Sequence, residues 1–327
     1  MHSTAKSATS GALVGIADLF DAHRKFLWGL SYRLTGSAAD ADDIVQETFV
    51  RAMERPPDDT SQPWRPWLVR VALNLGRDLL RRRRRRSYVG PWLPAPIETG
   101  DEASPPTFEP VVDGEHTTEG RYDLLESVSF AFLLALEALT PQQRAVLLLR
   151  DVFDYSVRDT AAALGLTEPN VKTTHHRARA AMRDYDRARC VPTRALQEQT
   201  REVLAQFMSS LLSGDVPTIE AMLAESVRGL SDGGGEFFAA RKPLIGRQRV
   251  LRFHWNIWRR RMAEARFAAR IINGLPAVVG QFVTGKPGEP PRVVFRCDID
   301  GAGRIVALHS VVATRKLTGV DFASLAV

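Results

Sequence analysis

The stretch SVRDTAAALGLTEPNVKTTHHRARAAM, residues 156–182, has the spacing of two short helices joined by a tight turn. Gly165 lies where the turn is needed, and glycine adopts positive φ without steric cost. Thr167 is placed to cap the second helix, and Pro169 is tolerated in its first turn. A support helix is expected upstream, over Pro141–Asp151. We therefore predict a helix-turn-helix, a motif whose second helix enters the major groove of DNA.

The second helix of this motif carries polar side chains suited to DNA. Val171, Ala178 and Met182 are expected to face the helical bundle. The candidates for base or phosphate contacts are Asn170, Lys172, Thr173, His176, Arg177 and Arg179. Adjacent side chains on a helix diverge by about 100°, so the pair His175–His176 is not expected to bind a metal ion.

A second cationic helix lies upstream, in PWLVRVALNLGRDLLRRRR, residues 66–84. The apolar positions predict a core stripe of Leu68, Val71, Ala72, Leu75 and Leu79. Another face, about 40° wide, carries Arg70, Asn74, Arg77 and Arg81. Arg82–Arg86 continue the positive charge. Because arginines neutralise phosphates and asparagine pairs with adenine, this helix is predicted to contact nucleic acid.

Two tryptophans precede this helix, in the proline-rich loop ERPPDDTSQPWRPW, residues 54–67. Trp64 and Trp67 are available to stack on an unpaired base. The alternative is that they pack in the core, and this alternative is strongest for Trp67, which adjoins the apolar stripe.

The segment SAADADDIVQETFVRAME, residues 37–54, predicts an amphipathic helix. Its apolar face groups Val45, Thr48, Phe49, Ala52 and Met53. Its acids, Asp40, Asp43, Glu47 and Glu54, gather on roughly the opposite face. They are either solvent-exposed charges that favour the helix N-terminus or a docking face for a basic partner.

Composition divides the chain into four segments. Residues 14–87 and 121–187 are helical in pattern, and residues 88–120 between them are rich in proline, glycine and acids, as is typical of a linker. Residues 194–327 combine a helix with strands. The expected fold is therefore multidomain, with two all-α domains followed by an α+β domain.

The last segment begins with a predicted helix over Arg194–Ser213. Glycine-bounded, β-branched runs at residues 276–285, 291–300 and 304–314 predict strands. The turn signal Asp300–Gly303 predicts a hairpin between the last two.

Composition also excludes several classes of protein. Hydrophobic residues make up 44% of the 327 residues and charged residues 25%, as in ordinary globular proteins. Cys190 and Cys297 are the only cysteines, so neither a disulfide framework nor a zinc site is expected. The apolar run Ser127–Thr140 contains Glu137 and predicts a buried helix rather than a membrane span. With a net charge of +6 and a poor signal sequence, a cytoplasmic protein without cofactor or metal is expected.

The order and spacing of these motifs resemble regions 2 and 4 of the extracytoplasmic-function sigma factors of bacterial RNA polymerase. The resemblance covers roughly residues 15–187 and rests on DADDIVQETFVRAM, PWLVRVALNLGRDLLRRRRR and ALEALTPQQRAVLLLRDVFDYSVRDTAAALGLTEPNVKTTHHRARAAMR. It implies a transcription initiation factor that binds core polymerase, recognises the −35 and −10 promoter elements and promotes DNA melting. The partners implied are the β′ clamp coiled coil, the β flap and promoter DNA.

The resemblance implies a role for each surface. The docking face for the coiled coil would comprise Asp40, Asp42, Asp43, Gln46 and Glu47. Recognition and opening of the −10 element would involve Trp64, Trp67, Arg70, Asn74, Arg77 and Arg81. The helix over residues 168–184, with the six candidates given above, would recognise the −35 element.

The rest of the chain is similar to the SigJ-like subgroup, which carries a C-terminal SnoaL-like (NTF2-like) domain with a cone-shaped cavity. The similarity rests on YVGPWLPAPI and LSDGGGEFFAARKPLIGRQRV, although Ala95 and Glu236 depart from the subgroup pattern. It implies that this domain regulates the sigma factor in cis. The residues implied in that regulation are Trp92, Leu93, Pro94, Asp232, Gly233, Gly234 and Gly235.

Two alternatives remain open from the residues alone: a helix-turn-helix regulator that needs no core polymerase, and a DNA-tethered NTF2-like isomerase or cyclase. The catalytic candidates for the enzyme would be Asp232, His254, Asp298 and His309. Every tyrosine precedes the domain, so a tyrosine oxyanion donor is absent. His254 is expected on a helix with Phe253 and Trp255 in the core, and the protein is not expected to be an enzyme.

Overall fold

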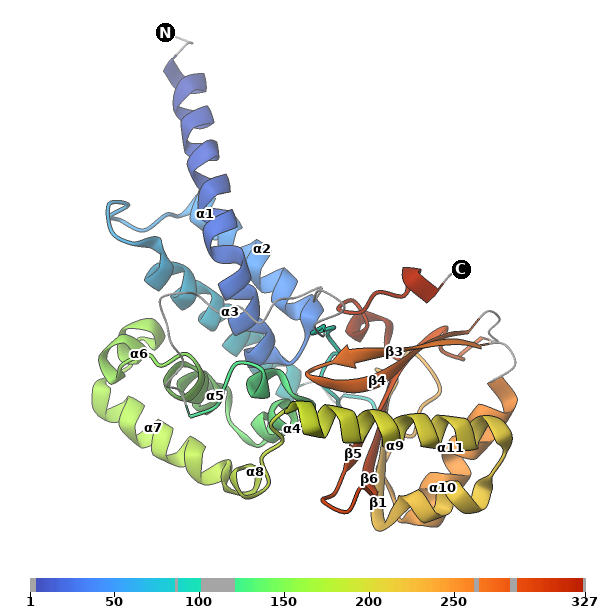
Figure 1. The fold of residues 1–327 in the computed structure, drawn as a ribbon. Helices are drawn as coiled ribbons and strands as arrows, with labels where there is room; N and C mark the ends of the chain where they lie inside the picture. Colours follow the sequence, from blue (N-terminus) through green and yellow to red (C-terminus); the bar gives the residue numbers. More distant parts are fainter. Residues whose placement is uncertain (1–3, 86–87, 101–120, 262–264, 283–286, 326–327) are drawn as a thin grey trace. The chain divides into compact units, whose positions relative to one another are not determined.

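The computed structural model describes residues 4–85, 88–100, 121–261, 265–282 and 287–325, and Figure 1 shows their helices and strands. The chain forms two compact units. The first contains the described residues up to Arg85 together with 121–127 and 135–189, and the second contains 88–100, 128–134 and the described residues from Cys190 onward. In these ranges no helix is long and apolar enough to cross a membrane.

The first unit begins with three helices: α1 (Thr4–Thr35), α2 (Ala38–Glu54) and α3 (Trp64–Arg85). Gly36 ends α1 with a φ of 68°, a conformation that favours glycine. The Ser37 side chain then caps α2 by accepting a hydrogen bond from the Asp40 backbone N–H at 3.2 Å. A Cβ on Gly76 would lie 2.4 Å from Leu34 Cδ2, so the absence of a side chain allows α3 to approach α1 closely.

Two predicted apolar faces need correction. In α3 the buried residues are Leu68, Val69, Ala72, Leu73, Gly76 and Leu80. The predicted stripe members Val71, Leu75 and Leu79 are only half-buried, because α3 packs on both α1 and α2 through positions rotated by about one residue. In α2, Met53 was grouped with the apolar face but is 50% exposed.

The helix-turn-helix of the first unit is confirmed. The support helix α5 (Pro141–Leu147) is followed by the π-helical turn η3 (Leu148–Val152), α6 (Val157–Leu164), α7 (Glu168–Ala181) and the short α8 (Arg183–Arg187). Gly165 is left-handed with a φ of 64°, and Thr167 accepts a hydrogen bond from the Asn170 backbone N–H. Val171, Ala178 and Met182 are fully buried, as predicted.

The second unit is built on one six-stranded sheet of order β2-β1-β6-β5-β4-β3. Its strands are β1 (Leu223–Asp232), β2 (Leu244–Ile245), β3 (Ala265–Ile272), β4 (Leu275–Phe282), β5 (Arg292–Ile299) and β6 (Ile305–Val311). Strands β1 and β6 pair in parallel, and all other pairs are antiparallel. The predicted hairpin between β5 and β6 is confirmed, because Asp300 accepts hydrogen bonds from the backbone N–H groups of Ala302 and Arg304. The α+β prediction is confirmed with it.

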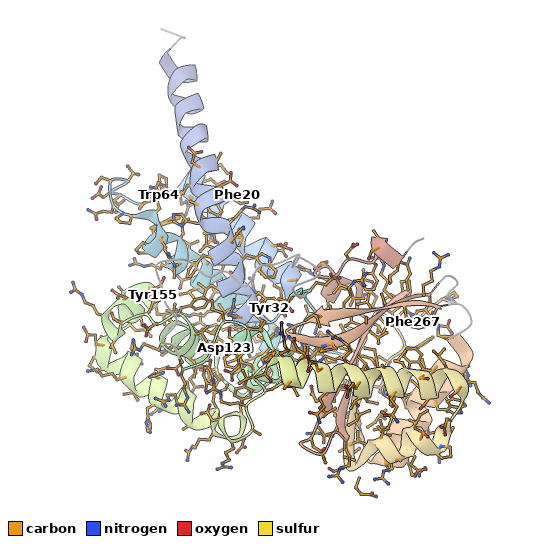
Figure 2. All side chains as sticks on the ribbon, in the orientation of Figure 1. Phe20, Tyr32, Trp64, Asp123, Tyr155 and Phe267 are labelled. Atoms are coloured by element: carbon orange, nitrogen blue, oxygen red, sulfur yellow. The ribbon has the colours of Figure 1, made fainter. Side chains whose placement is uncertain are left out.

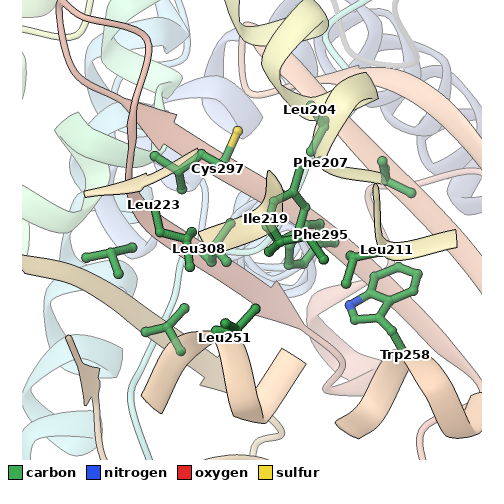
Figure 3. Close-up of a cluster of buried hydrophobic side chains, with 14 of the residues drawn as sticks. Leu204, Phe207, Leu211, Ile219, Leu223, Leu251, Trp258, Phe295, Cys297 and Leu308 are labelled. Atoms are coloured by element: carbon green, nitrogen blue, oxygen red, sulfur yellow. The ribbon is translucent and has the colours of Figure 1, made fainter. Parts of the chain in front are cut away.

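Hydrophobic residues pack on both faces of this sheet. On one face lie α9 (Arg194–Ser213), α10 (Val216–Met222) and α11 (Arg247–Arg261), which contribute Phe207, Ile219 and Trp258 to the cluster in Figure 3. A second cluster joins Leu93 and Phe130 to strand residues such as Val279 and to the C-terminal segment. The sheet is therefore covered on both faces, and the Trp-Leu-Pro segment is part of the second cover.

The apolar run Ser127–Thr140 is not one buried helix, contrary to the prediction. It contains the short helix α4 (Phe130–Ala135) between the 3-10 turns η1 (Glu126–Val128) and η2 (Leu136–Ala138). Ser129 caps α4 by accepting a hydrogen bond from the Phe132 backbone N–H at 3.2 Å. In the second unit, Asn273 Nδ2 donates to the Val128 carbonyl at 2.6 Å, and such side-chain bonds compete with a continuous helix.

Candidate functional site

The acidic face of α2 is formed by side chains that alternate with its buried positions. Asp42, Asp43 and Gln46 are exposed, whereas Asp40 and Glu47 are partly covered. Trp28 Nε1 donates to Asp42 Oδ1 at 2.7 Å. Burial raises the pKa of the Asp42 carboxyl and Asp43 adds to this, whereas the hydrogen bond from Trp28 opposes it. The face is therefore a cluster of carboxylates at the surface, held in place at Asp42.

Trp64, labelled in Figure 2, lies at the first turn of α3. It packs edge to face with Trp67, and the two ring centroids are 6.0 Å apart. Both are half-buried. Their rings support one another instead of filling the core, which was the alternative considered for Trp67. Each therefore keeps partly accessible aromatic surface at the start of the cationic helix.

The cationic face of α3 is only partly open. Arg70, Asn74 and Arg81 are exposed, and Arg81 pairs with Asp78 at 2.8 Å. Arg77 is half-buried and donates from Nη1 to the Leu164 carbonyl at the end of α6, at 3.4 Å. Burial lowers the pKa of Arg77, and the positive charge of Arg81 adds to this. In the first unit, the helix-turn-helix thus covers one member of the predicted DNA face.

The arginine run that ends α3 contains two kinds of residue, those bound to other parts of the first unit and those that are exposed. Arg83 donates from Nη1 to the Thr35 carbonyl at 2.8 Å and from Nη2 to Glu137 Oε1 at 2.7 Å. Arg84 donates to the Leu139 carbonyl. Arg82 and Arg85 are exposed, and Arg86 lies outside the described residues. The two central arginines, Arg83 and Arg84, therefore bind other parts of the first unit, whereas Arg82 and Arg85 on either side are exposed.

The predicted recognition helix α7 presents all six candidate side chains to solvent, namely Asn170, Lys172, Thr173, His176, Arg177 and Arg179. Two of them are also engaged locally. Thr173 Oγ1 donates to the Pro169 carbonyl at 3.0 Å, and Asn170 Oδ1 accepts from Thr174 Oγ1 at 3.0 Å. The remaining four offer cationic or imidazole groups along an otherwise open face.

The histidine pair of α7 divides as its helical spacing predicts. His175 Nε2 lies 2.8 Å from Asp151 Oδ1, whereas His176 is exposed. Among the residues that the structure describes, no group of three or more histidine, cysteine, aspartate or glutamate side chains is arranged to hold a metal ion. His175 therefore has a structural partner in the support segment.

The Trp-Leu-Pro segment is bound inside the second unit by one buried carboxylate. Asp232, at the end of β1, is fully buried. It accepts hydrogen bonds from Tyr88 Oη at 2.6 Å and from the Leu93 backbone N–H at 2.8 Å. Lys316 Nζ lies 2.5 Å from Asp232 Oδ2, donates to the Leu93 carbonyl, and sits 4.3 Å from the Trp92 ring centroid. Leu93 and Pro94 are buried against this cluster.

The glycines after Asp232 allow this close approach. Gly234 and Gly235 have φ values of 60° and 78°. A Cβ on Gly235 would lie 3.2 Å from Val89, and one on Gly233 only 2.7 Å from the Phe237 carbonyl oxygen. Glu236, which departs from the subgroup pattern, accepts hydrogen bonds from the Thr314 backbone N–H and hydroxyl. Lys316 was missed from the sequence because TRKLTG carries no local signal.

The four catalytic candidates are not brought together. Asp232 is paired with Lys316, and His309 Nδ1 lies 3.7 Å from Asp298 Oδ2. His254 lies elsewhere, on α11 beside Phe295. It is itself buried, whereas Phe253 and Trp255 are half-buried, which reverses the predicted assignment of core residues. Of these four described side chains, only His309 and Asp298 lie close to one another.

Two family patterns match the chain. Residues 19–86 match the family described as Sigma-70 region 2, and residues 129–182 match Sigma-70, region 4. The first match contains the acidic face and the cationic helix, and the second contains the helix-turn-helix.

Whole proteins are also similar. The chain is 30% identical over 308 residues to the ECF RNA polymerase sigma factor SigJ of Mycobacterium tuberculosis, covering 92% of each chain. It is 31% identical over 229 residues to the sigma factor SigG of the same organism, covering 64% of this chain and 60% of that one. The crystal structure of the Mycobacterium tuberculosis SigJ protein superposes with a TM-score of 0.68 at 27% identity, covering 93% of this chain and 98% of that one.

Proposed function

This chain belongs to the extracytoplasmic-function sigma factors of bacterial RNA polymerase, and we propose which of its surfaces perform each step of transcription initiation. As a sigma factor it binds core polymerase and promoter DNA, recognises the −35 and −10 elements and promotes melting. The similar proteins are sigma factors of RNA polymerase. A regulator that needs no core polymerase and an NTF2-like enzyme, the two alternatives from the sequence, are therefore not favoured. We place its site of action in the cytoplasm, where the polymerase works.

The acidic face of α2 is proposed to dock on a basic coiled coil of the polymerase. The support is the exposure of Asp42, Asp43 and Gln46 on the side of α2 opposite its buried residues. Such rim charges mainly speed association and make it sensitive to salt. Replacing Asp42 and Asp43 together by asparagine should therefore weaken binding to core polymerase. Asp184→Asn, at an exposed acid on α8, is the matched control.

The open cations of α7 are proposed to contact the −35 element, and those of α3 the −10 element. The observation that carries this proposal is that charged side chains emerge from both helices next to fully packed apolar faces. Lys172→Ala should reduce the slope of log affinity against log salt by about 1, which is the loss of one phosphate contact. Arg249→Ala, at an exposed cation of α11, should leave that slope unchanged.

The first unit as described is proposed to be a closed state that core polymerase must open. Arg77 cannot reach DNA while it donates to the Leu164 carbonyl, and Arg83 is held by Glu137. Opening would release Arg77 to the −10 face. Two introduced cysteines, at Asn74 on α3 and Ala162 on α6, should report this as a larger separation between attached probes once core polymerase is bound.

The second unit is proposed to regulate the sigma factor in cis through the Trp-Leu-Pro segment. The support is that Asp232 and Lys316 bind both backbone polar groups of Leu93. The Trp-Leu-Pro segment belongs to the tether, which is the stretch of chain between the residues that match regions 2 and 4. A change in the cluster therefore changes how this tether is held. Asp232→Asn should therefore change the yield of promoter-specific run-off transcript, whereas Glu236→Gln should leave it close to that of the unaltered chain.

Run-off transcription with core polymerase is the decisive measurement. A promoter-specific product that depends on the added chain is expected. If neither the full chain nor the Asp232→Asn variant yields such a product at any promoter tested, the assignment of steps to these surfaces is wrong.

A further inference from the structure

A cavity of about 360 Å³ lies in the second unit between α11 and the sheet. Its wall is mainly aromatic and aliphatic, with Trp258 and Phe295 visible in Figure 3, and it also includes Phe253, Phe282, Val293 and Val312. The Trp258 and Phe295 ring centroids are 5.7 Å apart at an interplanar angle of 77°. A cavity of this size and character is typical of sites for small apolar ligands.

Two large apolar side chains that line the cavity are exposed to solvent. Phe238 is 77% exposed and Ile257 is 39% exposed, and both line the cavity. Exposed large apolar groups that gather at an opening mark binding sites more often than random surface. Because they are continuous with the aromatic wall, they extend the apolar path from solvent to the interior.

A buried imidazole is part of the wall of this cavity. His254 lines it and is 3% exposed, and its Nε2 has no hydrogen-bond partner among the residues that the structure describes. Burial lowers the pKa of His254 to about 4, so the imidazole is neutral at pH 7. Ser231 and Ser310, which are register partners on β1 and β6, also line the cavity. A buried polar atom left without a partner costs free energy that a suitable ligand atom would recover.

The charged groups of the wall are Arg260, Arg261 and Glu289. Arg261 lies over the Phe282 ring at 3.7 Å, donates from Nη1 to the Pro290 carbonyl at 2.9 Å, and has Nε 3.7 Å from Glu289 Oε2. Arg260 is exposed, so water screens its charge. Because the buried cation Arg261 already has Glu289 as its counter-charge, an anionic ligand would lose its hydration without gaining a buried partner of its own.

We propose that this cavity is a binding site for a neutral, planar, mainly apolar small molecule that carries one hydroxyl or carbonyl oxygen. The ring system lies against Trp258 and Phe295, and the oxygen hydrogen-bonds His254 Nε2. The site is independent of the proposed roles in promoter recognition, because it needs neither polymerase nor DNA.

The test uses the full chain and three probes that share one ring system: 2-naphthol, naphthalene and 2-naphthoate. Binding is measured by calorimetry and by quenching of tryptophan fluorescence. We expect 2-naphthol to bind about tenfold more tightly than naphthalene, which corresponds to one hydrogen bond to a buried partner. The anion 2-naphthoate should bind more weakly than both. Failure of 2-naphthol and naphthalene to bind, or tighter binding of the anion, would overturn the proposal.

Two variants separate the hydrogen bond from the cavity. His254→Phe should bind 2-naphthol and naphthalene equally, because the polar atom is gone while the aromatic wall remains. Ser310→Phe should fill the cavity and abolish binding of both, with circular dichroism confirming that the variant is folded. Leu212→Ala, at a 67% exposed leucine of α9 outside the cavity, is the control and should bind as the unaltered chain does. An undiminished preference for 2-naphthol in His254→Phe contradicts the assigned hydrogen bond.

Discussion

The two units use buried charge in different ways. In the first unit, arginines reach across helices to backbone carbonyls: Arg144 donates from Nη1 to the Leu34 carbonyl at 3.0 Å, and Arg83 to that of Thr35 at 2.8 Å. In the second unit, a fully buried carboxylate meets a buried ammonium, Asp232 with Lys316 at 2.5 Å. Loss of Arg83 leaves the Thr35 carbonyl and the partly exposed Glu137 without a donor, whereas loss of Lys316 leaves the fully buried Asp232 without its counter-charge. Loss of Lys316 should therefore destabilise the protein more than loss of Arg83.

The largest effect is expected for Lys316→Met. It leaves Asp232 buried without its counter-charge, and breaking a buried pair in this way costs about 3–5 kcal/mol. Hydrogen exchange of the β1 amides should quicken in proportion. The matched control is Glu236→Gln, whose exposed side chain bonds Thr314 and should cost less than about 1 kcal/mol. Equal exchange rates of the β1 amides in both variants would show that the buried pair of Asp232 and Lys316 stabilises the protein no more than the exposed Glu236 does.

Lowering the pH from about 6.5 to about 4 should destabilise the second unit. Burial lowers the pKa of His254 from 6.5 to about 4. The unfolded chain therefore binds more protons than the folded one between these values, so stability falls as the pH drops from about 6.5 to about 4 and levels below that. The free energy of unfolding falls by about 3 kcal/mol because of this one histidine. His309, which faces Asp298, Arg296 and Arg228, has its pKa lowered to about 4 as well and adds a second loss of the same sign.

The measurement for this prediction is urea unfolding of the full chain at a series of pH values, followed by the fluorescence of Trp258 and its neighbours. His254→Phe should flatten the dependence between pH 6.5 and 4 without removing it, since His309 remains. Titration of the His254 ring itself near pH 6.5 in the folded chain, assigned by NMR, would be incompatible with its burial.

Sequence patterns predicted helices and turns that have local signals far better than they predicted contacts between residues distant in the sequence. The helix-turn-helix follows from Gly165, Thr167 and the helical spacing of Val171 and Ala178, all of which are local signals. The cluster around Asp232 joins residues separated by 84 and 139 positions, and no periodicity encodes such a pairing. Lys316 was consequently missed.

The errors have a common physical origin in tertiary packing. Strands β1 and β3 contain few β-branched residues, so neither was predicted from the glycine-bounded, β-branched runs that identified β4, β5 and β6. The buried face of α3 is rotated from the predicted apolar stripe because both α1 and α2 pack on it. Charge runs are ambiguous for the same reason, since Arg83 and Arg82 look identical in sequence but only Arg83 meets Glu137.

That ambiguity leads to a test with paired variants of the arginine run. Arg83→Gln with Arg84→Gln removes hydrogen bonds to Thr35, Glu137 and Leu139, and should destabilise the first unit by about 1–3 kcal/mol. Arg82→Gln with Arg85→Gln changes exposed residues only, and should instead reduce the salt dependence of promoter binding. Thermal unfolding and a salt titration of promoter binding distinguish the two pairs. Identical behaviour of both pairs would contradict the division of the run.

The smallest expected effect links the cavity to the Trp-Leu-Pro segment within the second unit. Ser231 lines the cavity, and the next residue, Asp232, accepts the hydrogen bond of the Leu93 N–H. A ligand that orders the end of β1 should therefore hold Leu93 more firmly. Coupling of less than about 1 kcal/mol corresponds to less than about fivefold slower exchange of the Leu93 amide in saturating 2-naphthol. The Val171 amide of the first unit is the internal reference, and unchanged exchange at Leu93 despite measured binding would mean that the site and the tether are energetically separate.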